Sequence, residues 1–478
     1  MNRIPAALSS AQIREEELVL LEKESRFCSH GDTVHYAKKP KFFARSNGSY
    51  LYDLHGTEFL DLQMWYSAVN LGYANAAVTE AMRVQMETLP QLACQYLHRE
   101  KIELAEMICE SVERGFGMKG RVHFNVGGAQ AVEDALKLVR KATGRQRMLA
   151  FQGGYHGRTL AASAITSSYR YREAFGEFAD RAEFLPFPYV FRSSFPGDAQ
   201  KTEDHCIGEF ARLFEHEYTG AWNPKTGRSE FGALFAEAVQ GTGGYVIPPK
   251  NYFRRLAAIC RERGILLVDD EIQMGFYRTG KMWAMEHFDV QPDIIVFGKA
   301  LTNGMNPLSG IWAREELINP GVFGPGSTHS TFSSNTLGTA TGLAVMKAFA
   351  GGDYESTVKR KGAYFLGKLG TLKRKHAEIG DIDGLGLALR MEMCEADGFT
   401  PSRQLADCMF QIGLEGDLKI AARPMGLILD TGGYYKNVIT LAPSLEITDA
   451  EIDLAALALD QVLARAKESL NIDRYKAE

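Results

Sequence analysis

Three short, continuous apolar runs stand out in the middle of the chain, flanked by segments with helical periodicity. They span residues 233–236, 265–268 and 294–297. A run that is apolar at every position has to be buried on both faces, and parallel strands between two layers of helices meet that condition. The runs therefore predict a mostly parallel sheet of the α/β class.

The pattern changes on either side of this region. Residues 9–24 predict a helix, and turn signals separate short strands around residues 49–57. Beyond about residue 340, helix and strand are mixed, and a helix is predicted near 448–468. We expect an N-terminal segment (1–75) that joins a small domain, a large domain (76–339) that holds the sheet, and a C-terminal small domain (340–478) of α+β type.

Composition narrows the class of protein. The chain has 478 residues, 45% hydrophobic and 24% charged, which is typical of a globular protein. A net charge of −5 argues against nucleic acid or an anionic membrane as the main partner, and no segment reaches the roughly 18–20 uninterrupted apolar residues of a membrane span. Seven scattered cysteines without a CxxC pair favour free thiols and no metal site. Without a signal or transit pattern, we expect a cytoplasmic protein.

Each apolar run is followed by polar residues. Glu237 follows the first run, Asp270 and Glu271 follow the second, and Lys299 follows the third. Ligands of open α/β sheets bind beyond the carboxyl ends of the strands. A carboxylate and a lysine in that position are the minimum equipment for pyridoxal 5′-phosphate (PLP), because the acid keeps the pyridine nitrogen protonated and the lysine forms a Schiff base. Either residue alone indicates little, whereas the joint pattern is specific.

A glycine-rich turn precedes a helical pattern upstream of these strands. Gly127 and Gly128 lie just before the helical run 131–137. The start of such a helix offers free backbone N–H groups and a positive dipole end to a phosphate. Alone this signal is weak, since many Gly-Gly turns only begin helices, and no Gly-Lys-Ser/Thr follows as in a nucleotide-binding loop.

These motifs together resemble the class III aminotransferases, the ornithine, acetylornithine and 4-aminobutyrate group. Residues 267–280 and 292–310 are similar to that family's signature, and 237–241 match its Glu-Pro-Val-Gln-Gly except at the second position. The resemblance runs from about residue 45 to 465. It implies PLP fold type I, a homodimer with shared active sites and an amino-transfer reaction.

The resemblance assigns the cofactor contacts residue by residue. Asp270 would pair with the pyridine nitrogen and Lys299 would carry the aldehyde, while Asp269 and Glu271 would be structural. The remaining cofactor residues would be Gly128 and Ala129 (phosphate amides), Tyr155 and Ile272 (the two ring faces), Gln273 (near the ring hydroxyl) and Thr331 (the phosphate of the neighbouring subunit). Serines replace both expected glycines after Thr331, which predicts a less flexible loop.

Substrate contacts are expected where the chain departs from the family. Arg158 is a candidate for a substrate carboxylate, the alternative being a structural ion pair. Thr440 stands where the family has an arginine, so Glu237 lacks its usual partner and should pair with another arginine or with a cationic substrate. A competing possibility is that another arginine, such as Arg423, enters the space left at Thr440. Trp65 and Tyr66 replace small residues of the pocket, which favours a bulky or flat acceptor unless they only fill the core.

We therefore expect a PLP-dependent aminotransferase that moves an amino group from glutamate or alanine to an aldehyde or ketone, one without an α-carboxylate, by a ping-pong mechanism. The same cofactor apparatus serves racemases, epimerases and aminomutases of this family, and decarboxylases. Those activities remain alternatives. A PLP-bound regulatory module is disfavoured because no DNA-binding pattern precedes the domain.

Overall fold

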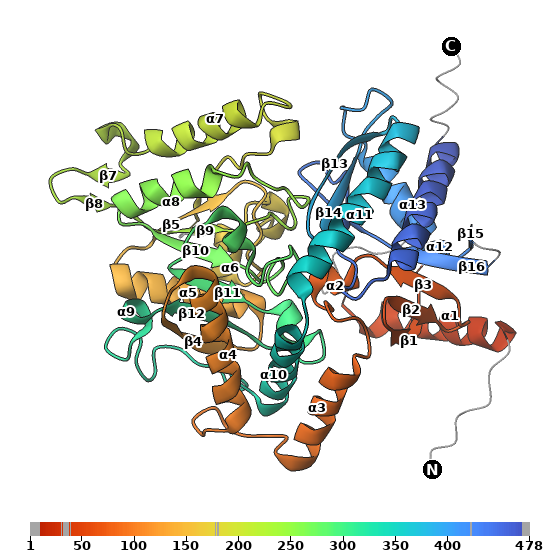
Figure 1. Ribbon diagram of the computed structural model, residues 1–478, viewed down its shortest axis with the longest axis horizontal. Helices are drawn as coiled ribbons and strands as arrows, with labels where there is room; N and C mark the ends of the chain where they lie inside the picture. The colour runs from red at the N-terminus through yellow and green to blue at the C-terminus, as the bar shows by residue number, and fades with distance from the viewer. Residues whose placement is uncertain are drawn as a thin grey trace.

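A computed structural model describes residues 10–29, 31, 38, 40–176, 178, 181–420 and 423–470. The predicted helix at the N-terminus is α1 (Ser10–Phe27), and residue 9 of that prediction lies outside the described residues. Figure 1 shows a large lobe around a central sheet, with the N- and C-terminal elements gathered beside it.

The central sheet has seven strands in the order β4-β12-β11-β10-β9-β5-β6. Their bounds are β4 (Gly120–Asn125), β5 (Arg147–Phe151), β6 (Glu183–Leu185), β9 (Phe231–Ala236), β10 (Leu266–Asp270), β11 (Ile294–Phe297) and β12 (Ser309–Arg314). Strand β12 runs antiparallel to both neighbours, and the other pairs are parallel. The three predicted apolar runs are confirmed as β9, β10 and β11.

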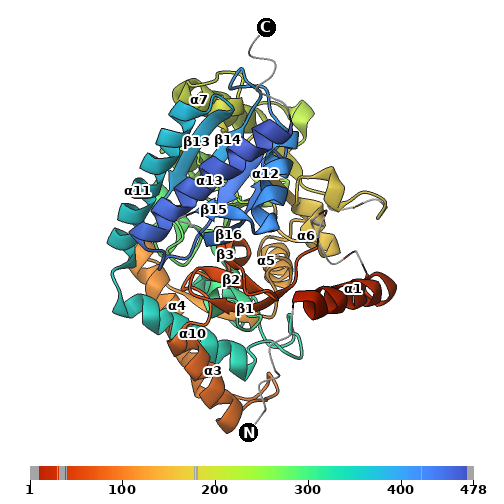
Figure 2. The same cartoon turned by 90° about the vertical axis from the view of Figure 1, so that its right-hand side faces the viewer.

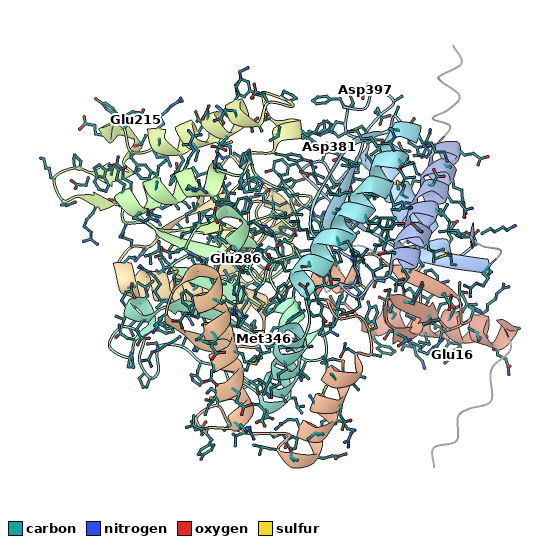
Figure 3. All side chains as sticks on the ribbon, viewed as in Figure 1. Glu16, Glu215, Glu286, Met346, Asp381 and Asp397 are labelled. Atoms are coloured by element: carbon teal, nitrogen blue, oxygen red, sulfur yellow. The ribbon has the colours of Figure 1, made fainter. Side chains whose placement is uncertain are left out.

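Helices cover both faces of this sheet, which is why its central strands β9 and β11 carry no polar side chain. On one face, α5 (Gly128–Thr143), α6 (Leu160–Ile165) and α9 (Glu315–Ile318) pack on Phe235 and Val268. On the other, α4 (Arg99–Phe116), α7 (Ala199–Arg212) and α8 (Tyr252–Glu262) pack on Leu234 and Ile295. Helices α3 (Ala76–Thr88) and α10 (Thr336–Gly351) lie together below the sheet in Figure 1. Figure 3 shows Met346 of α10 inside the side-chain mass and Glu16 and Glu215 at its edge.

The two ends of the chain share a second sheet of five strands, β1-β2-β3-β16-β15. Its strands are β1 (Phe43–Asn47), β2 (Tyr50–Asp53), β3 (Glu58–Asp61), β15 (Leu418–Ile420) and β16 (Arg423–Ile428). Parallel pairing of β3 with β16, with Leu60 opposite Leu427, joins the N-terminal segment to the C-terminal part of the chain. The predicted boundary at 339/340 falls inside α10, and the domain limits stay a prediction.

A third sheet of four antiparallel strands completes this region, in the order β13-β14-β18-β17. Its strands are β13 (Ile379–Leu385), β14 (Ala388–Met393), β17 (Asp430–Gly432) and β18 (Val438–Leu441). Figure 2 shows α11 (Tyr354–Lys375), α13 (Asp449–Ser469) and α12 (Arg403–Glu415) side by side over these strands. The predicted C-terminal helix is confirmed as α13, which Thr448 and Glu451 start with a capping box.

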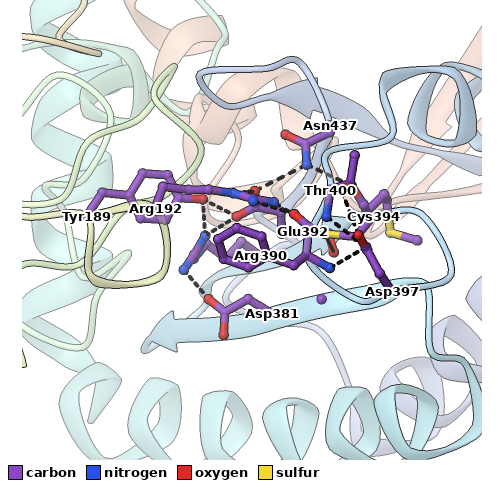
Figure 4. Close-up of polar contacts among 12 residues, drawn as sticks. Tyr189, Arg192, Asp381, Arg390, Glu392, Cys394, Asp397, Thr400 and Asn437 are labelled. Carbon is purple, nitrogen blue, oxygen red and sulfur yellow. Dashed lines mark hydrogen bonds and ion pairs between the residues drawn. The ribbon is translucent and has the colours of Figure 1, made fainter. Parts of the chain in front are cut away.

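A buried polar network ties β14 to the large lobe and to the β17–β18 hairpin (Figure 4). Glu392 accepts hydrogen bonds from Arg192 Nε at 2.6 Å and from Asn437 Nδ2 at 3.2 Å. Arg390 donates to the hydroxyl of Tyr189 at 2.6 Å and pairs with Glu392. Because buried charges are costly unless paired, this network holds the hairpin in one position. In the part of the chain described, every helix falls short of the length and apolarity that a membrane crossing needs.

Candidate active site

The carboxyl ends of the strands carry the predicted chemical groups to one cavity of about 470 Å³. Asp270 is the last residue of β10, Glu237 follows β9, and Lys299 begins the short helix η6 (Lys299–Thr302) after β11. The cavity is lined by the predicted residues Gly128, Ala129, Tyr155, Arg158, Glu237, Asp270, Ile272, Gln273 and Lys299. Of the residues predicted from the sequence, Thr331, Trp65 and Tyr66 do not line this cavity.

Lys299 lies on this cavity with its amine removed from water. Burial lowers the pKa of Lys299 to about 8, although the charges of Asp270, Glu237 and Asp430 oppose that effect. A lower pKa raises the fraction of neutral amine, which is the form that attacks a carbonyl. The backbone of Lys299 has a φ of 41°, so the residue is held in a strained left-handed conformation.

Asp270 is paired with a histidine that sequence reasoning did not single out. His156 Nδ1 lies 2.8 Å from Asp270 Oδ2, and both side chains are buried. Burial favours the neutral ring, but the hydrogen bond and charge of Asp270 override it and raise the pKa of His156. The backbone N–H of Ile272 donates to Asp270 Oδ1 at 3.2 Å. These two contacts fix the orientation of the Asp270 carboxylate. In the sequence, the one sign of its histidine partner is the position of His156 within the motif 155–158.

The start of α5 provides an open set of backbone donors at the same cavity. Its N-cap is Gly127, and no side chain caps the helix. A Cβ on Gly128 would lie 3.0 Å from Ile272 Cδ1, and a Cβ on Gly157 would lie 2.6 Å from Ala129 Cβ. Glycine at these positions therefore lets the chain pack closely while the first N–H groups of the helix stay available to an anion. A phosphate group fits these donors.

Glu237 is not held by an arginine, which corrects one expectation. Its Oε1 accepts a hydrogen bond from the Tyr155 N–H at 2.9 Å and its Oε2 from the Gly241 N–H at 2.8 Å. Burial raises the pKa of Glu237 to about 7. Arg423, which could have replaced the arginine missing at Thr440, is exposed at the start of β16 and lines neither cavity of the site. Backbone amides thus satisfy this carboxylate without a counter-charge.

A second cavity of about 190 Å³ adjoins the first and shares Tyr155, Arg158, Gln273 and Lys299 with it. It is also lined by Tyr66, Arg170, Tyr171, Asp430 and Lys436. The hydroxyl of Thr440 donates to Asp430 Oδ2 at 3.0 Å. Arg170, Asp430 and Lys436 could not be predicted from a local pattern, because the fold brings them to the cavity from separate segments. This cavity leaves open space beside Lys299.

Tyr66 reaches that cavity from an unusual turn. Residues Met64, Trp65, Tyr66 and Ser67 all have left-handed φ values, from 43° to 65°. Such a conformation costs roughly 1–2 kcal/mol per residue. Asp61 supports the turn by accepting the N–H groups of Gln63 and Met64, each at 2.8 Å.

The same turn sends Trp65 away from the site. Its side chain is 56% exposed and approaches Gly304, so Trp65 lines neither cavity and does not fill the core. The expected pair of pocket aromatics is therefore reduced to Tyr66 in this chain.

Thr331 lies apart from the cofactor cavity of its own chain. It is exposed and lines an apolar surface cavity together with Phe332, which is 69% exposed. Ser334, one of the serines that replace glycine, has a φ of 51°, so it adopts the backbone conformation that glycine favours. The loop presents Thr331 outward.

The fold and the site define a PLP enzyme: a lysine, a carboxylate paired with a histidine and an uncapped helix start meet at the strand ends of an α/β sheet. Residues 33–463 match the family model of class III aminotransferases. The chain belongs to this family, and its cofactor is PLP.

The relatives of this chain include proteins named as aminotransferases and proteins named as racemases. The chain is 32% identical to a probable 4-aminobutyrate aminotransferase of Bacillus subtilis, over 94% of this chain and 97% of that protein. It is 31% identical to an alanine/serine racemase of Pyrococcus horikoshii, over 94% and 90%. A PLP-bound amine transaminase from an uncultivated Pseudomonas species has a similar structure, with a TM-score of 0.82 at 27% identity, over 92% and 99%.

Proposed function

We propose that this chain acts as a homodimeric aminotransferase in which Lys299 holds PLP and Asp270 sustains its reactivity. The observation that carries the proposal is the common cavity of Lys299, Asp270 and the start of α5. When bound, PLP supplies an aldehyde that condenses with amines and a ring that accepts electrons. The homodimer and the cytoplasmic location are parts of the proposal that rest on the sequence.

The residues of the chain divide the remaining work. Lys299 Nζ takes and returns the proton at the reacting carbon, for which a pKa of about 8 is suited near neutral pH. Asp270, positioned by His156, would hold a proton on the ring nitrogen. Tyr155 and Ile272 would cover the two ring faces, and Gln273 would lie near the ring hydroxyl. Gly128 and Ala129 would bind the phosphate, to which Thr331 of the partner subunit would add a hydroxyl.

The acceptor is an aldehyde or ketone without an α-carboxylate. Thr440 provides no charge for such a group, and its neighbour Asp430 would repel it. Arg158 holds the carboxylate of the donor, glutamate or alanine, and Tyr66 lines the substrate-side cavity beside it. The relative named for 4-aminobutyrate supports this proposal, because the amine of that compound is on a carbon without a carboxylate.

The test is to reduce the holoenzyme with borohydride and map the labelled peptide. Lys299 should carry the label, and Lys299→Ala should give a folded protein that takes none. A label on any other lysine would refute the assignment. His156→Ala should leave Lys299 labelled and lower the turnover, since it acts through Asp270.

Amino-acid racemisation is the second candidate, because the relatives include an alanine/serine racemase and a leucine/methionine racemase. A racemase converts one enantiomer of an amino acid into the other and releases no keto acid. Incubation with L-alanine or L-leucine, without any acceptor, followed by chiral chromatography and assay of keto acid, separates the two. Loss of enantiomeric excess without keto acid or amine transfer would replace the aminotransferase proposal. Aminomutase or decarboxylase activity would appear in the same samples as a positional isomer or an amine.

A further inference from the structure

Asp430 is a carboxylate of the substrate-side cavity with few partners of its own. It begins β17 and faces Thr440 across the hairpin, whose hydroxyl donates to Oδ2 at 3.0 Å. Within the described part of the chain, no lysine, arginine or histidine forms an ion pair with Asp430. Two other carboxylates act on Lys299: Asp270 is paired with His156, and Glu237 has both oxygens occupied by backbone amides. Asp430 is therefore the acid with capacity left for a ligand.

The charge of Asp430 reaches the groups around the cavity. After burial, it is the next largest cause that raises the pKa of Tyr66 to about 12. It also opposes the burial that lowers the pKa of Lys299. A charge that acts on both groups acts on a substrate between them.

Cations border the same cavity, and one of them, Lys436, lies near enough to Asp430 for the charge of this carboxylate to oppose the lowering of its pKa. Arg158, Arg170 and Lys436 all border it, and the Arg158 guanidinium lies 4.8 Å from the ring centroid of Tyr171. In a ping-pong reaction the donor and the acceptor occupy this space in turn. The cations suit the carboxylates of an amino-acid donor, whereas Asp430 suits a different group on the other substrate.

The surroundings of Asp430 favour a cation. The aromatic residues Tyr66, Tyr155 and Tyr171 line the cavity with it, and ring faces attract positive charge. The hairpin is held by Asn437, which binds Glu392 of the network in Figure 4. The hairpin therefore holds the Asp430 carboxylate in one position at the cavity, as a group that determines specificity requires.

We propose that Asp430 selects the acceptor by pairing with a cationic group remote from the reacting carbon, so that the amine product is a diamine. This inference rests on the aminotransferase function proposed above. The donor amino acid becomes a 2-keto acid, and the C=O carbon of the acceptor becomes a carbon that bears hydrogen and an amino group. No other oxidant or reductant is needed. Asp430 also repels a carboxylate in the same place, which adds discrimination.

The experiment runs the reaction from the amine side with three amines whose far ends are a cationic, a neutral and an anionic group. They are 1,5-diaminopentane, pentylamine and 5-aminopentanoate, each with pyruvate or 2-oxoglutarate as amino acceptor, and kcat/KM is measured for the holoenzyme. We expect the wild type to prefer the diamine to pentylamine by about 10- to 100-fold, the range of one charge-assisted hydrogen bond, and 5-aminopentanoate to be poorest.

Two variants assign this order to Asp430. Asp430→Asn should bring the diamine and pentylamine to within a few-fold of each other. Asp430→Arg should make 5-aminopentanoate the best of the three. Asp289→Asn is the matched control, because Asp289 is an exposed aspartate paired with Arg254 away from the site, and it should keep the wild-type order.

Failure of the two proposals can be told apart. If no amine is converted and neither glutamate nor alanine yields a keto acid, the aminotransferase function is overturned and the inference with it. If amines react but the diamine is not preferred, or if Asp430→Asn keeps the preference, only the role of Asp430 is overturned. If Asp430→Arg does not fold, Asp430→Asn alone decides.

Discussion

The acids beside Asp270 should make the protein less stable as the pH rises. Asp269 and Glu271 are fully buried, and burial raises the pKa of Glu271 from 4.5 to about 7 and that of Asp269 well above its usual range. Both folded-state pKa values lie above the unfolded-state values. At a pH between the unfolded-state and the folded-state pKa, the folded protein therefore binds more protons than the unfolded chain. The stabilisation is therefore complete below about pH 4.5 and is lost as the pH rises through about 7.

For Glu271 the gap between 4.5 and about 7 corresponds to about 3 kcal/mol of unfolding free energy. Glu271→Gln removes this titration while keeping an oxygen for the Met285 N–H, which now donates at 2.9 Å. Urea pulse proteolysis at pH 5 and pH 8.5 should show the wild type losing about 2–3 kcal/mol more than the variant between the two conditions. The exposed Glu215→Gln serves as control and should follow the wild type. Parallel pH dependence of wild type and Glu271→Gln would refute the reasoning.

The other predictions concern the site. Asp270→Asn should keep much of the PLP, measured by absorbance, and lose about 10²–10³-fold in kcat, because a neutral amide does not hold the ring proton; a few-fold loss would mean that another acid does this work. Thr331→Ala should weaken PLP retention, and mixing inactive Thr331 and Lys299 variants should restore activity in heterodimers; verified subunit exchange without recovery would contradict the shared site. Arg158→Ala should slow the single-turnover half-reaction of glutamate about tenfold more than that of the amine, and equal losses would exclude it as the donor's carboxylate ligand. Thr440→Arg should neutralise its neighbour Asp430 and improve kcat/KM for carboxylate-bearing acceptors; unchanged ratios would show that this pair does not face the substrate.

The parts of the fold that could be predicted depend on local pattern. Runs that are apolar at every position identified β9, β10 and β11, because strands covered on both faces have no polar side. The direction of β12 has no such signal, since an antiparallel strand in the same sheet is buried in the same way. Pairing of β3 with β16 was beyond a local pattern, because strands so far apart in sequence choose each other through tertiary packing.

The site divides along the same line. Asp270 and Lys299 could be predicted because they follow strands, and strand ends of an α/β sheet face a common crevice. Trp65 was expected at the pocket because the corresponding position lines the pocket in the family. A resemblance does not predict backbone conformation, and the left-handed turn directs this side chain outward. The pairing of His156 with Asp270 could not be predicted from a local pattern, since the two residues are 114 positions apart along the chain.

Glu237 and Asp430 show why charge in a sequence does not reveal which acid acts on a substrate. Both follow apolar residues and both end near Lys299, so a pattern treats them alike. Two backbone amides donate hydrogen bonds to Glu237, and burial raises its pKa to about 7, so that part of its charge is removed near neutral pH. The Asp430 side chain accepts one hydrogen bond, from the hydroxyl of Thr440. A carboxylate with free hydrogen-bond acceptor positions contributes more to selectivity than one that the protein already hydrogen-bonds. A substrate that removes water from the free carboxylate without pairing with it binds at a cost in free energy. The arginine missing at Thr440 therefore changes the choice of substrate through Asp430 and not through Glu237.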